Sequence, residues 1–299
     1  MGNPVQALVR WVRGGGLSTF VLVLPLLIAF GYFAWFPIGR AVVMSFQRTV
    51  PPADPVWVGW DNFRFVLEDP RFWTSVRNTG YFTLLALVFG YPLPLVLAVV
   101  MSELRKARGL YSVLAYLPVV IPPVVAVLLW RFFFDAGPDG VFNTMLGWVG
   151  LGPYPWIQEP SWAMPSLVLQ ATWANAGATV IIYLAAISGI ATELYDAAEV
   201  DGAGLWRKIW HITLPQLRNI LLITLIVQVI ATFQVFTEPF LMTGGGPRNS
   251  TTTVLLQIRD YAFRFDNYGA ATALSVLLAL FLALMSALYF RVTRAWSTS

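Results

Sequence analysis

The chain has no cysteine and only one histidine, His211, among its 299 residues. Without cysteine it can form no disulfide, iron–sulfur cluster or thiolate metal site. A metal site at His211 would need several carboxylates beside it, and the sequence places no such cluster there. The pattern GxxxxGK[ST], which holds nucleotide phosphates, is also absent. The chain is therefore predicted to bind no cofactor and to carry no ATP site of its own.

Charged residues are scarce as well. They make up 11% of the chain, whereas 58% of the residues are hydrophobic and the mean hydropathy is +0.68. Soluble domains carry about 25% charged residues, so the composition indicates a membrane protein. The net charge of +4 is small and spread along the chain, and it does not indicate a nucleic-acid-binding surface.

Six apolar runs are long enough to cross a bilayer as helices, which takes about 20 residues. They are 19–46, 81–101, 110–134, 164–190, 220–242 and 270–290. An isolated open strand cannot satisfy its backbone in lipid, so the predicted fold is an all-α integral membrane protein with six transmembrane helices. The first run exceeds the roughly 7–15 apolar residues of a signal peptide, and it is therefore interpreted as an uncleaved span.

Several predicted spans contain proline, which kinks a helix and frees backbone carbonyls. These prolines are Pro25, Pro37, Pro92, Pro94, Pro118, Pro122 and Pro123. Kinked helices around a water-lined cavity would suit transport, but ordinary packing within a bundle explains them equally well.

With an even number of spans, both termini lie on one side of the membrane. The basic residues on that side are Arg10, Arg13, Arg105, Lys106, Arg108, Arg207, Lys208, Arg218, Arg291 and Arg294. They flank the spans closely, so the positive-inside rule makes this side cytoplasmic. The predicted organisation is a cytoplasmic segment 1–18, a six-span domain 19–295 and a cytoplasmic tail 296–299. Within the domain we expect outer segments 47–80, 135–162 and 243–269 and a cytoplasmic loop 191–219.

The first outer segment is rich in aromatic residues. Its tryptophans and phenylalanines, Trp57, Trp60, Phe63, Phe72 and Trp73, are predicted to anchor short amphipathic helices at the membrane surface rather than to contact a ligand.

The cytoplasmic loop contains an unusual polar stretch, 193–215, which reads ELYDAAEVDGAGLWRKIWHITLP. Thr192 is predicted to N-cap a short helix whose acidic residues lie near its positive end. Leu194, Ala197 and Ala198 would share one face of that helix. Alanines on an exposed apolar face allow another surface to approach closely.

Gly202 and Gly204 would end this helix, because glycine fits the left-handed position after a helix. A second short helix is predicted over 205–211, and Pro215 suits the first turn of the fifth span. Two such short helices are not stable alone, so the loop is interpreted as a docking surface.

The spacing of this loop resembles a known signature. The cytoplasmic loop of permease subunits of bacterial binding-protein-dependent ABC importers reads Glu-Ala-Ala, three residues, Gly, nine residues and Ile-x-Leu-Pro. The matching residues are Asp196, Ala197, Ala198, Gly202, Ile212, Leu214 and Pro215. Asp196 stands in place of Glu, which keeps the charge and shortens the reach.

This resemblance implies the type I ABC importer permease fold and a coupling helix that docks into a cytoplasmic ATPase. The residues it assigns to ATPase coupling are Glu193, Asp196, Ala197, Ala198, Asp201, Gly202, Ala203, Leu214 and Pro215.

A second stretch resembles the carbohydrate-type permeases, specifically the subunit with a Thr-Gly-Gly-Gly-Pro loop after its fifth span. That loop comprises Thr243, Gly244, Gly245, Gly246 and Pro247. The loop is either a tight structural turn or part of the contact with a binding protein.

Polar residues inside spans often mark a transport pathway. The pathway candidates in the fourth and fifth spans are Gln170, Trp173, Asn175, Tyr183, Gln228, Gln234, Thr237 and Glu238. Each could instead make a hydrogen bond between helices. Gln228, Gln234 and Glu238 do not share one helical stripe, so we expect only two of these three to line a cavity.

The resemblance implies one transmembrane subunit of an importer in the bacterial cytoplasmic membrane. Its expected partners are a second homologous permease, two ATPases that bind ATP and Mg²⁺, an extracytoplasmic sugar-binding protein and the lipid bilayer. An ion-coupled secondary transporter is the alternative, but it would need buried acids, and Glu238 is the one acid within a predicted span. An intramembrane enzyme is disfavoured, because the apolar runs contain no His/Asp/Glu cluster. The scarcity of basic residues in the spans favours neutral over phosphorylated sugars.

Overall fold

The computed structural model describes residues 12, 14–50, 53–104 and 108–297. Most of the predicted segment 1–18 and the end of the tail 296–299 lie outside these residues. So do some of the groups used for the positive-inside prediction, namely Arg10, Arg13, Arg105, Lys106 and the side chains of Arg108 and Arg294.

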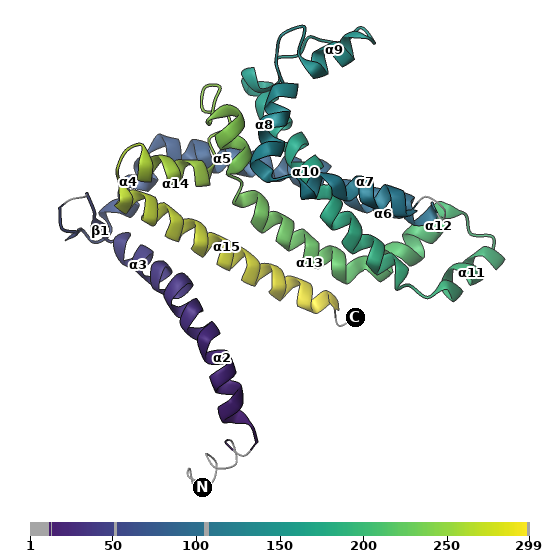
Figure 1. Ribbon diagram of the computed structural model, residues 1–299, viewed down its shortest axis with the longest axis horizontal. Coiled ribbons are helices and arrows are strands. Elements are labelled where there is room, and N and C mark those ends of the chain that lie inside the picture. Colours follow the sequence, from purple (N-terminus) through teal and green to yellow (C-terminus); the bar gives the residue numbers. More distant parts are fainter. Residues whose placement is uncertain (1–11, 13, 51–52, 105–107, 298–299) are drawn as a thin grey trace. The chain divides into compact units, whose positions relative to one another are not determined.

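Helices form nearly all of the described regular structure (Figure 1), and contacts divide the chain into two units. The first unit comprises residues 1–66 and 261–276, and the second 67–260 and 277–299. Elements that begin in the first stretch are α2 (Gly16–Phe30), η1 (Gly31–Trp35), α3 (Phe36–Met44), β1 (Gln47–Arg48), β2 (Val56–Trp57) and α4 (Asp61–Glu68). The prediction of a helical membrane fold is confirmed, with a small antiparallel pairing of β1 and β2 that was not predicted.

The second unit holds most of the helices. They are α5 (Pro70–Leu85), η2 (Ala86–Gly90), α6 (Pro92–Glu103), α7 (Arg108–Val120), α8 (Pro123–Phe133), α9 (Val141–Gly147), η3 (Trp156–Gln158), α10 (Pro160–Ser188), α11 (Thr192–Val200), α12 (Leu205–Lys208), η4 (Ile209–Thr213), α13 (Leu214–Phe233) and η5 (Pro239–Thr243). The last two helices, α14 (Val254–Phe263) and α15 (Tyr268–Ser297), run across the boundaries between the units.

Five described helical segments are long and apolar enough to span a membrane. They are Gly16–Met44, Pro70–Glu103, Pro160–Ser188, Leu205–Phe233 and Tyr268–Thr293. The third predicted span, 110–134, is instead two helices, α7 and α8, bent by 96° at their junction. Counted as one broken span, this pair gives the sixth crossing. The break follows from Pro122 and Pro123, since the residue before a proline avoids helical geometry; Pro122 has ψ 131°.

Two further boundaries differ from the prediction. The second span begins at Pro70 rather than at residue 81, because Asp69 caps it by accepting a hydrogen bond from the backbone N–H of Arg71. The fifth helix ends at Phe233 rather than at residue 242. Residues 234–236 then form an irregular segment, after which Thr237 and Glu238 are helical and lead into η5.

Three long spans contain a π turn immediately before a proline. Phe36, Tyr91 and Leu214 precede Pro37, Pro92 and Pro215, and each donates its N–H to the carbonyl five residues back. A proline has no N–H and its ring crowds the carbonyl four residues earlier. A π turn shifts the hydrogen-bond ladder by one residue, so the spans continue past these prolines without breaking.

The first unit is held together around the β1–β2 pairing. The Asn62 amide donates to the carbonyls of Ser45 and Gln47, both at 2.9 Å, and the Phe46 ring stacks on Trp57. Phe63 is buried there.

The aromatic residues of the first outer segment thus differ in their environments. Trp57, Trp60 and Trp73 are exposed, as expected of membrane-surface anchors, whereas Phe63 and Phe72 are buried. The prediction that all five are surface anchors is therefore wrong for the two phenylalanines. The tryptophans have polar edges that suit an interface, whereas phenylalanine has only apolar surface to bury.

The second unit packs around α10. Gly177 of α10 faces the backbone of α7 so closely that an added Cβ would overlap the carbonyl oxygen of Ala115. Gly90 faces Thr172 of α10 in the same way, with a built Cβ 2.8 Å from its Oγ1. Small residues let membrane helices approach closely.

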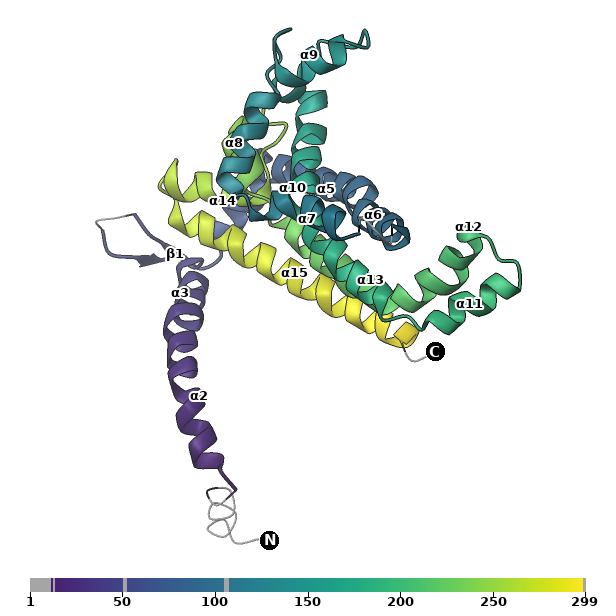
Figure 2. The ribbon, with the colours of Figure 1, turned by 45° about the vertical axis from the view of Figure 1, so that its right-hand side comes forward.

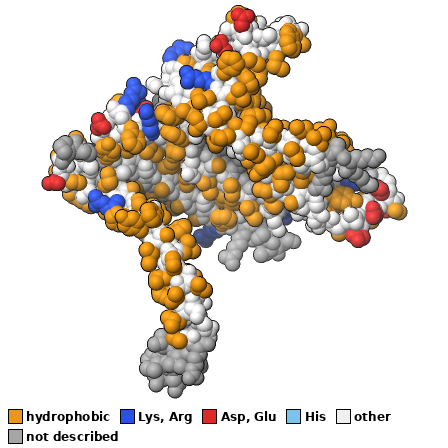
Figure 3. All heavy atoms as spheres, in the orientation of Figure 1, with side chains coloured by type: hydrophobic (Ala, Val, Ile, Leu, Met, Phe, Trp, Pro, Cys, Tyr) orange, Lys and Arg blue, Asp and Glu red, His pale blue; other side chains and the backbone are white. Residues whose placement is uncertain are grey.

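Hydrophobic side chains cover much of the described surface, and acidic ones gather over α11 (Figure 3).

Three tyrosines join α13 to its neighbours. Tyr91 donates to the carbonyl of Leu221 at 2.7 Å, and Tyr289 of α15 donates to the carbonyl of Leu222 at 2.6 Å. Tyr183 of α10 shares a 2.7 Å hydrogen bond with Thr224. Three hydroxyls from different helices thus converge on one short stretch of α13.

We expect Gly177→Ala to destabilise the protein. The added methyl group has no space against Ala115, and overpacking of this kind costs about 1–3 kcal/mol. Gly80→Ala is the matched control, because its Cβ would meet no heavy atom within 4 Å and alanine favours a helix over glycine. The apparent melting temperature in detergent should fall for the first variant only; equal values would contradict the close packing of α7 on α10.

Candidate functional site

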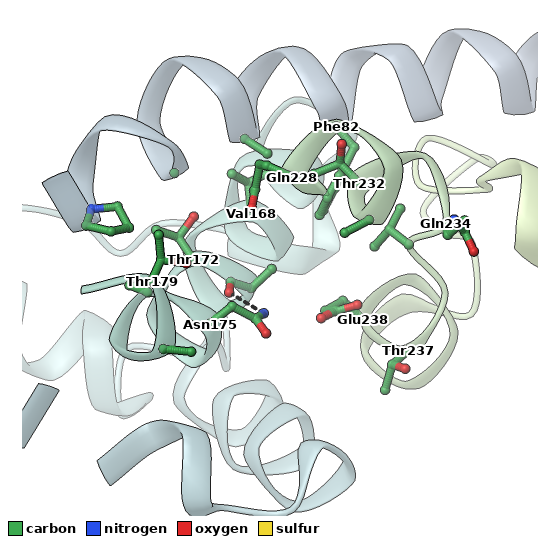
Figure 4. A pocket seen from close by; sticks show the side chains of 18 of the residues that line it. Phe82, Val168, Thr172, Asn175, Thr179, Gln228, Thr232, Gln234, Thr237 and Glu238 are labelled. Atoms are coloured by element: carbon green, nitrogen blue, oxygen red, sulfur yellow. Dashed lines mark hydrogen bonds between the residues drawn. The ribbon is translucent and has the colours of Figure 1, made fainter. Parts of the chain in front are cut away.

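A cavity of about 430 Å³ lies within the second unit, in the range typical of small-ligand sites. Its walls come from α5, η2, α6, α10, α13 and the segment 234–238 (Figure 4). Its polar lining consists of Thr172, Asn175, Thr179, Gln228, Thr232, Gln234, Thr237 and Glu238. None of the described residues that line it is lysine, arginine or histidine.

The end of α13 explains why more of the predicted pathway residues line this cavity than expected. A continuous helix would turn Gln228, Gln234 and Glu238 in different directions. Because the helix stops at Phe233, the segment 234–238 lies against the cavity and all three residues line it. The prediction that only two of them do so is therefore wrong.

Within the cavity, Asn175 on α10 and Glu238, directly before η5, point toward one another, whereas Gln234 lies apart from them (Figure 4). The Asn175 amide donates to the carbonyl of Ala171 at 2.8 Å, which leaves its oxygen toward the cavity. Glu238 is half-buried. Among the described residues, no lysine or arginine forms an ion pair with it.

The other pathway candidates lie elsewhere in the second unit. Trp173 packs on Trp130, with ring centroids 5.3 Å apart, in an aromatic cluster. Tyr183 is fully buried and bonded to Thr224, and Gln170 is buried in α10. These three residues have packing roles, which helical spacing alone does not distinguish from lining a cavity.

Three lining residues that the sequence did not single out are Thr172 and Thr179 on α10 and Thr232 on α13. Threonine is common in membrane helices, where it bonds back to the preceding turn, and Thr232 does so with the carbonyl of Val229. Thr172 lies three residues before Asn175 and Thr179 four residues after it, and this helical spacing marks a polar stripe on α10.

The loop predicted to be cytoplasmic, 191–219, contains one separate short helix, α11. It begins at Thr192, with Ala191 rather than Thr192 at the N-cap position, which corrects the predicted cap. Gly202 has φ +74°, as predicted for a left-handed residue. The N–H groups of Gly202 and Ala203 reach the carbonyls of Glu199 and Ala198, at 3.0 and 2.8 Å. This pair of bonds is the Schellman arrangement that closes a helix.

The second predicted short helix, 205–211, is not separate. The segments α12, η4 and α13 form one continuous helix, because the π turn before Pro215 carries the chain through the proline. Tyr195 ties α11 to this helix through a 2.9 Å hydrogen bond with Thr213, and Lys208 pairs with Glu199. Figure 2 shows α11 and α12 side by side beyond the end of α13.

The loop has apolar groups that are exposed among the residues that the structure describes. Val200 is 89% exposed and Trp206 74% exposed. Ala197 is exposed and Ala198 partly so. A shallow pocket lies next to them, lined by Gly202, Gly204, Leu205, Trp206, Arg207, Trp210 and His211. Exposed apolar patches of this kind mark protein-interaction sites.

The loop after η5 is folded rather than open. Thr251 is fully buried, shares a 2.7 Å bond with Thr243 and donates to the carbonyl of Gly246. Asn78 of α5 donates to the carbonyls of Asn249 and Thr252. Gly244 and Gly245 have positive φ angles, +59° and +90°. These hydrogen bonds give the loop a structural role, in agreement with the first of the two interpretations of its sequence.

Comparisons with known proteins agree on one family for this chain. Residues 90–298 match the family model described as "Binding-protein-dependent transport system inner membrane component". The chain is 30% identical to the arabinooligosaccharides transport system permease protein AraP of Halalkalibacterium halodurans, over 93% of this chain and 88% of that protein.

Solved structures agree with this match. A chain of a bacterial ABC transporter involved in the import of the acidic polysaccharide alginate superposes with a TM-score of 0.86 at 28% identity, covering 97% of this chain and 99% of that one. A second structure, of the alginate transporter in complex with an alginate pentasaccharide-bound periplasmic protein, gives a TM-score of 0.84 at 26% identity, covering 97% and 98%.

We expect Gly245→Ala to destabilise the loop after η5 more than Gly244→Ala. Both residues have positive φ, which costs an alanine about 1–2 kcal/mol. Only at Gly245 would the new Cβ also lie 2.7 Å from the Thr252 hydroxyl. Limited proteolysis and apparent melting temperature of the two variants measure the difference; a Gly245→Ala protein as stable as the Gly244→Ala protein would show that the loop relaxes freely.

Proposed function

Because the chain belongs to the family of binding-protein-dependent transport system inner membrane components, we propose that it is one of two transmembrane subunits of an ATP-driven importer of carbohydrate. The chain is a multi-pass permease subunit of an ABC importer. The observation that carries the proposal is the combination of a polar cavity within the helices and an exposed apolar loop at the end of α13.

Carbohydrate is the cargo class that the cavity suits. Its amide, hydroxyl and carboxylate groups can exchange hydrogen bonds with sugar hydroxyls. The relative AraP is named for arabinooligosaccharides and the superposed structures for alginate, which supports a saccharide here. An extracytoplasmic binding protein would deliver it.

The energy source lies on other subunits under this proposal. The chain has no sequence for holding nucleotide phosphates, so ATP and Mg²⁺ would bind to two cytoplasmic ATPases. The α11 loop would dock on one of them through its exposed apolar face, with the coupling residues named from the sequence on that surface. A second permease would complete the pathway opposite the cavity. Both termini and the α11 loop would then face the cytoplasm.

The proposal is tested by reconstituting the chain with its candidate partners in proteoliposomes. The assembled complex should hydrolyse ATP faster when the saccharide-loaded binding protein is added, and should accumulate the radiolabelled saccharide that stabilises that binding protein in a thermal-shift screen. Uptake by the chain alone, driven by an ion gradient, would overturn it.

We further expect Gly202→Pro to uncouple the importer while leaving membrane insertion intact. Proline cannot adopt the φ of +74° found at Gly202, and it removes the N–H that bonds the carbonyl of Glu199. The end of α11 would therefore reorient and lose its fit to the ATPase.

Gly204→Ala is the control, because Gly204 has φ −71° and its Cβ would meet nothing within 4 Å. Binding-protein-stimulated ATP hydrolysis should drop at least tenfold in the first variant and stay unchanged in the second. Normal stimulation in Gly202→Pro would show that the geometry at the end of α11 is not needed for coupling.

A further inference from the structure

Three of the polar side chains that line the cavity donate a hydrogen bond to the backbone of their own segment. One amide hydrogen of Asn175 binds the carbonyl of Ala171, and the Gln234 amide binds the carbonyl of Ile230. The Thr232 hydroxyl donates to the carbonyl of Val229. Each of these three side chains keeps an acceptor oxygen, and the two amides also keep a second donor hydrogen.

Glu238 adds a carboxylate to these acceptor oxygens. An ionised carboxylate only accepts hydrogen bonds. It faces Asn175 across the cavity (Figure 4), and no basic residue is among the described residues that line the site. Three basic groups near this segment have other partners: Arg131 donates to the carbonyl of Leu241, Arg248 pairs with Glu159, and Arg259 pairs with Asp260 and lies over the Phe240 ring.

Resting on the proposed function, we infer that Glu238 and the acceptor oxygens facing it make the cavity a charge filter, which admits uncharged, hydroxyl-rich saccharides and excludes those bearing carboxylate or phosphate groups. Sugar hydroxyls carry no charge and can donate hydrogen bonds to the carboxylate and to the oxygens facing it. A uronate or sugar phosphate would instead bring its own acceptor-only anion against a carboxylate, in a half-buried site where like charges interact more strongly than in water.

The proposed charge filter would distinguish the cargo of this chain from that of the alginate transporter on which it superposes. That transporter is involved in the import of an acidic polysaccharide, at 28% identity to this chain. The shared fold therefore does not determine the charge of the cargo, and the side chains of the cavity do. Glu238 is thus a specificity-determining residue.

The absence of cysteine from the chain allows a direct test. Thr237→Cys places one thiol in the cavity lining next to Glu238. The assembled importer, with cysteine-free partners in proteoliposomes, is treated with a cationic reagent, trimethylammonioethyl methanethiosulfonate, and separately with an anionic one, sulfonatoethyl methanethiosulfonate. Each modification rate is divided by the rate of the same reagent with free 2-mercaptoethanol.

The ratio of the two normalised rates reports the local potential. Any shift in the reactivity of the thiol affects both reagents alike and cancels. We expect the ratio to favour the cationic reagent by about tenfold, because the thiol would lie next to one unpaired negative charge in a partly buried site. Glu238→Gln should bring the ratio close to one, and Glu238→Asp, which keeps the charge, should preserve it.

Glu159→Gln is the matched control, because it removes a carboxylate that pairs with Arg248 and does not line the cavity. Its ratio should equal that of the parent. A parent ratio that favours the anionic reagent, or one that Glu238→Gln changes less than twofold, would overturn the inference.

The thiol measurement needs neither ATP hydrolysis nor cargo, so it fails independently of the proposed function. Binding-protein-stimulated ATPase activity in the same vesicles reports that function separately.

In a second experiment, the importer is supplied with the uncharged saccharide that its binding protein retains and with the C6-carboxylate form of that saccharide. The filter predicts that Glu238→Gln raises uptake of the carboxylate relative to the neutral form; an unchanged relative uptake would contradict the assignment of specificity to Glu238.

Discussion

The structure depends on one constraint: in hydrocarbon, every backbone N–H and C=O group needs a partner within the protein. An unbroken helix meets it automatically, so each irregularity in these spans requires a specific solution. The π turns before Pro37, Pro92 and Pro215 are one solution, because they shift the hydrogen-bond ladder instead of breaking it. Side chains that donate to free carbonyls are the other, as Thr253 does to Val235 and Arg131 does to Leu241.

The cavity depends on side chains that donate hydrogen bonds to free backbone carbonyls. The helix α13 can stop at Phe233 because the carbonyl of Ile230 accepts from the Gln234 side chain, and that of Val235, just beyond the end, from the Thr253 hydroxyl. The segment 234–236 is thereby held without helical geometry beside α10. Non-helical backbone at membrane depth is tolerated where it lines a protein cavity, and here that backbone brings Glu238 to face Asn175.

Much of this architecture could be predicted from the sequence. The apolar runs located the spans, and the spacing from Asp196 to Pro215 identified the loop of α11 and the left-handed Gly202. What could not be predicted follows from tertiary contacts. Hydropathy does not show that the helix in the run 220–242 stops at Phe233, since apolar residues continue beyond that point at 235–236 and 239–242. Helical spacing does not show that Tyr183 and Trp173 are packed in the core while Thr172 and Thr179 line the cavity, because polar and aromatic residues serve both roles.

The helix Leu205–Phe233 connects the two functional regions of the second unit. Its 29 residues span about 43 Å at 1.5 Å per residue, from the loop of α11 to the cavity. Between them, hydroxyls of Tyr91, Tyr183 and Tyr289 bind its carbonyls or Thr224. Those bonds stiffen the middle of the helix against α6, α10 and α15, so a displacement at the α11 end is not absorbed there. Under the proposed function, motion of the ATPase would therefore reach the cavity as a shift of this helix. The helices α6, α10 and α15, which the tyrosine hydrogen bonds connect to it, would move with it.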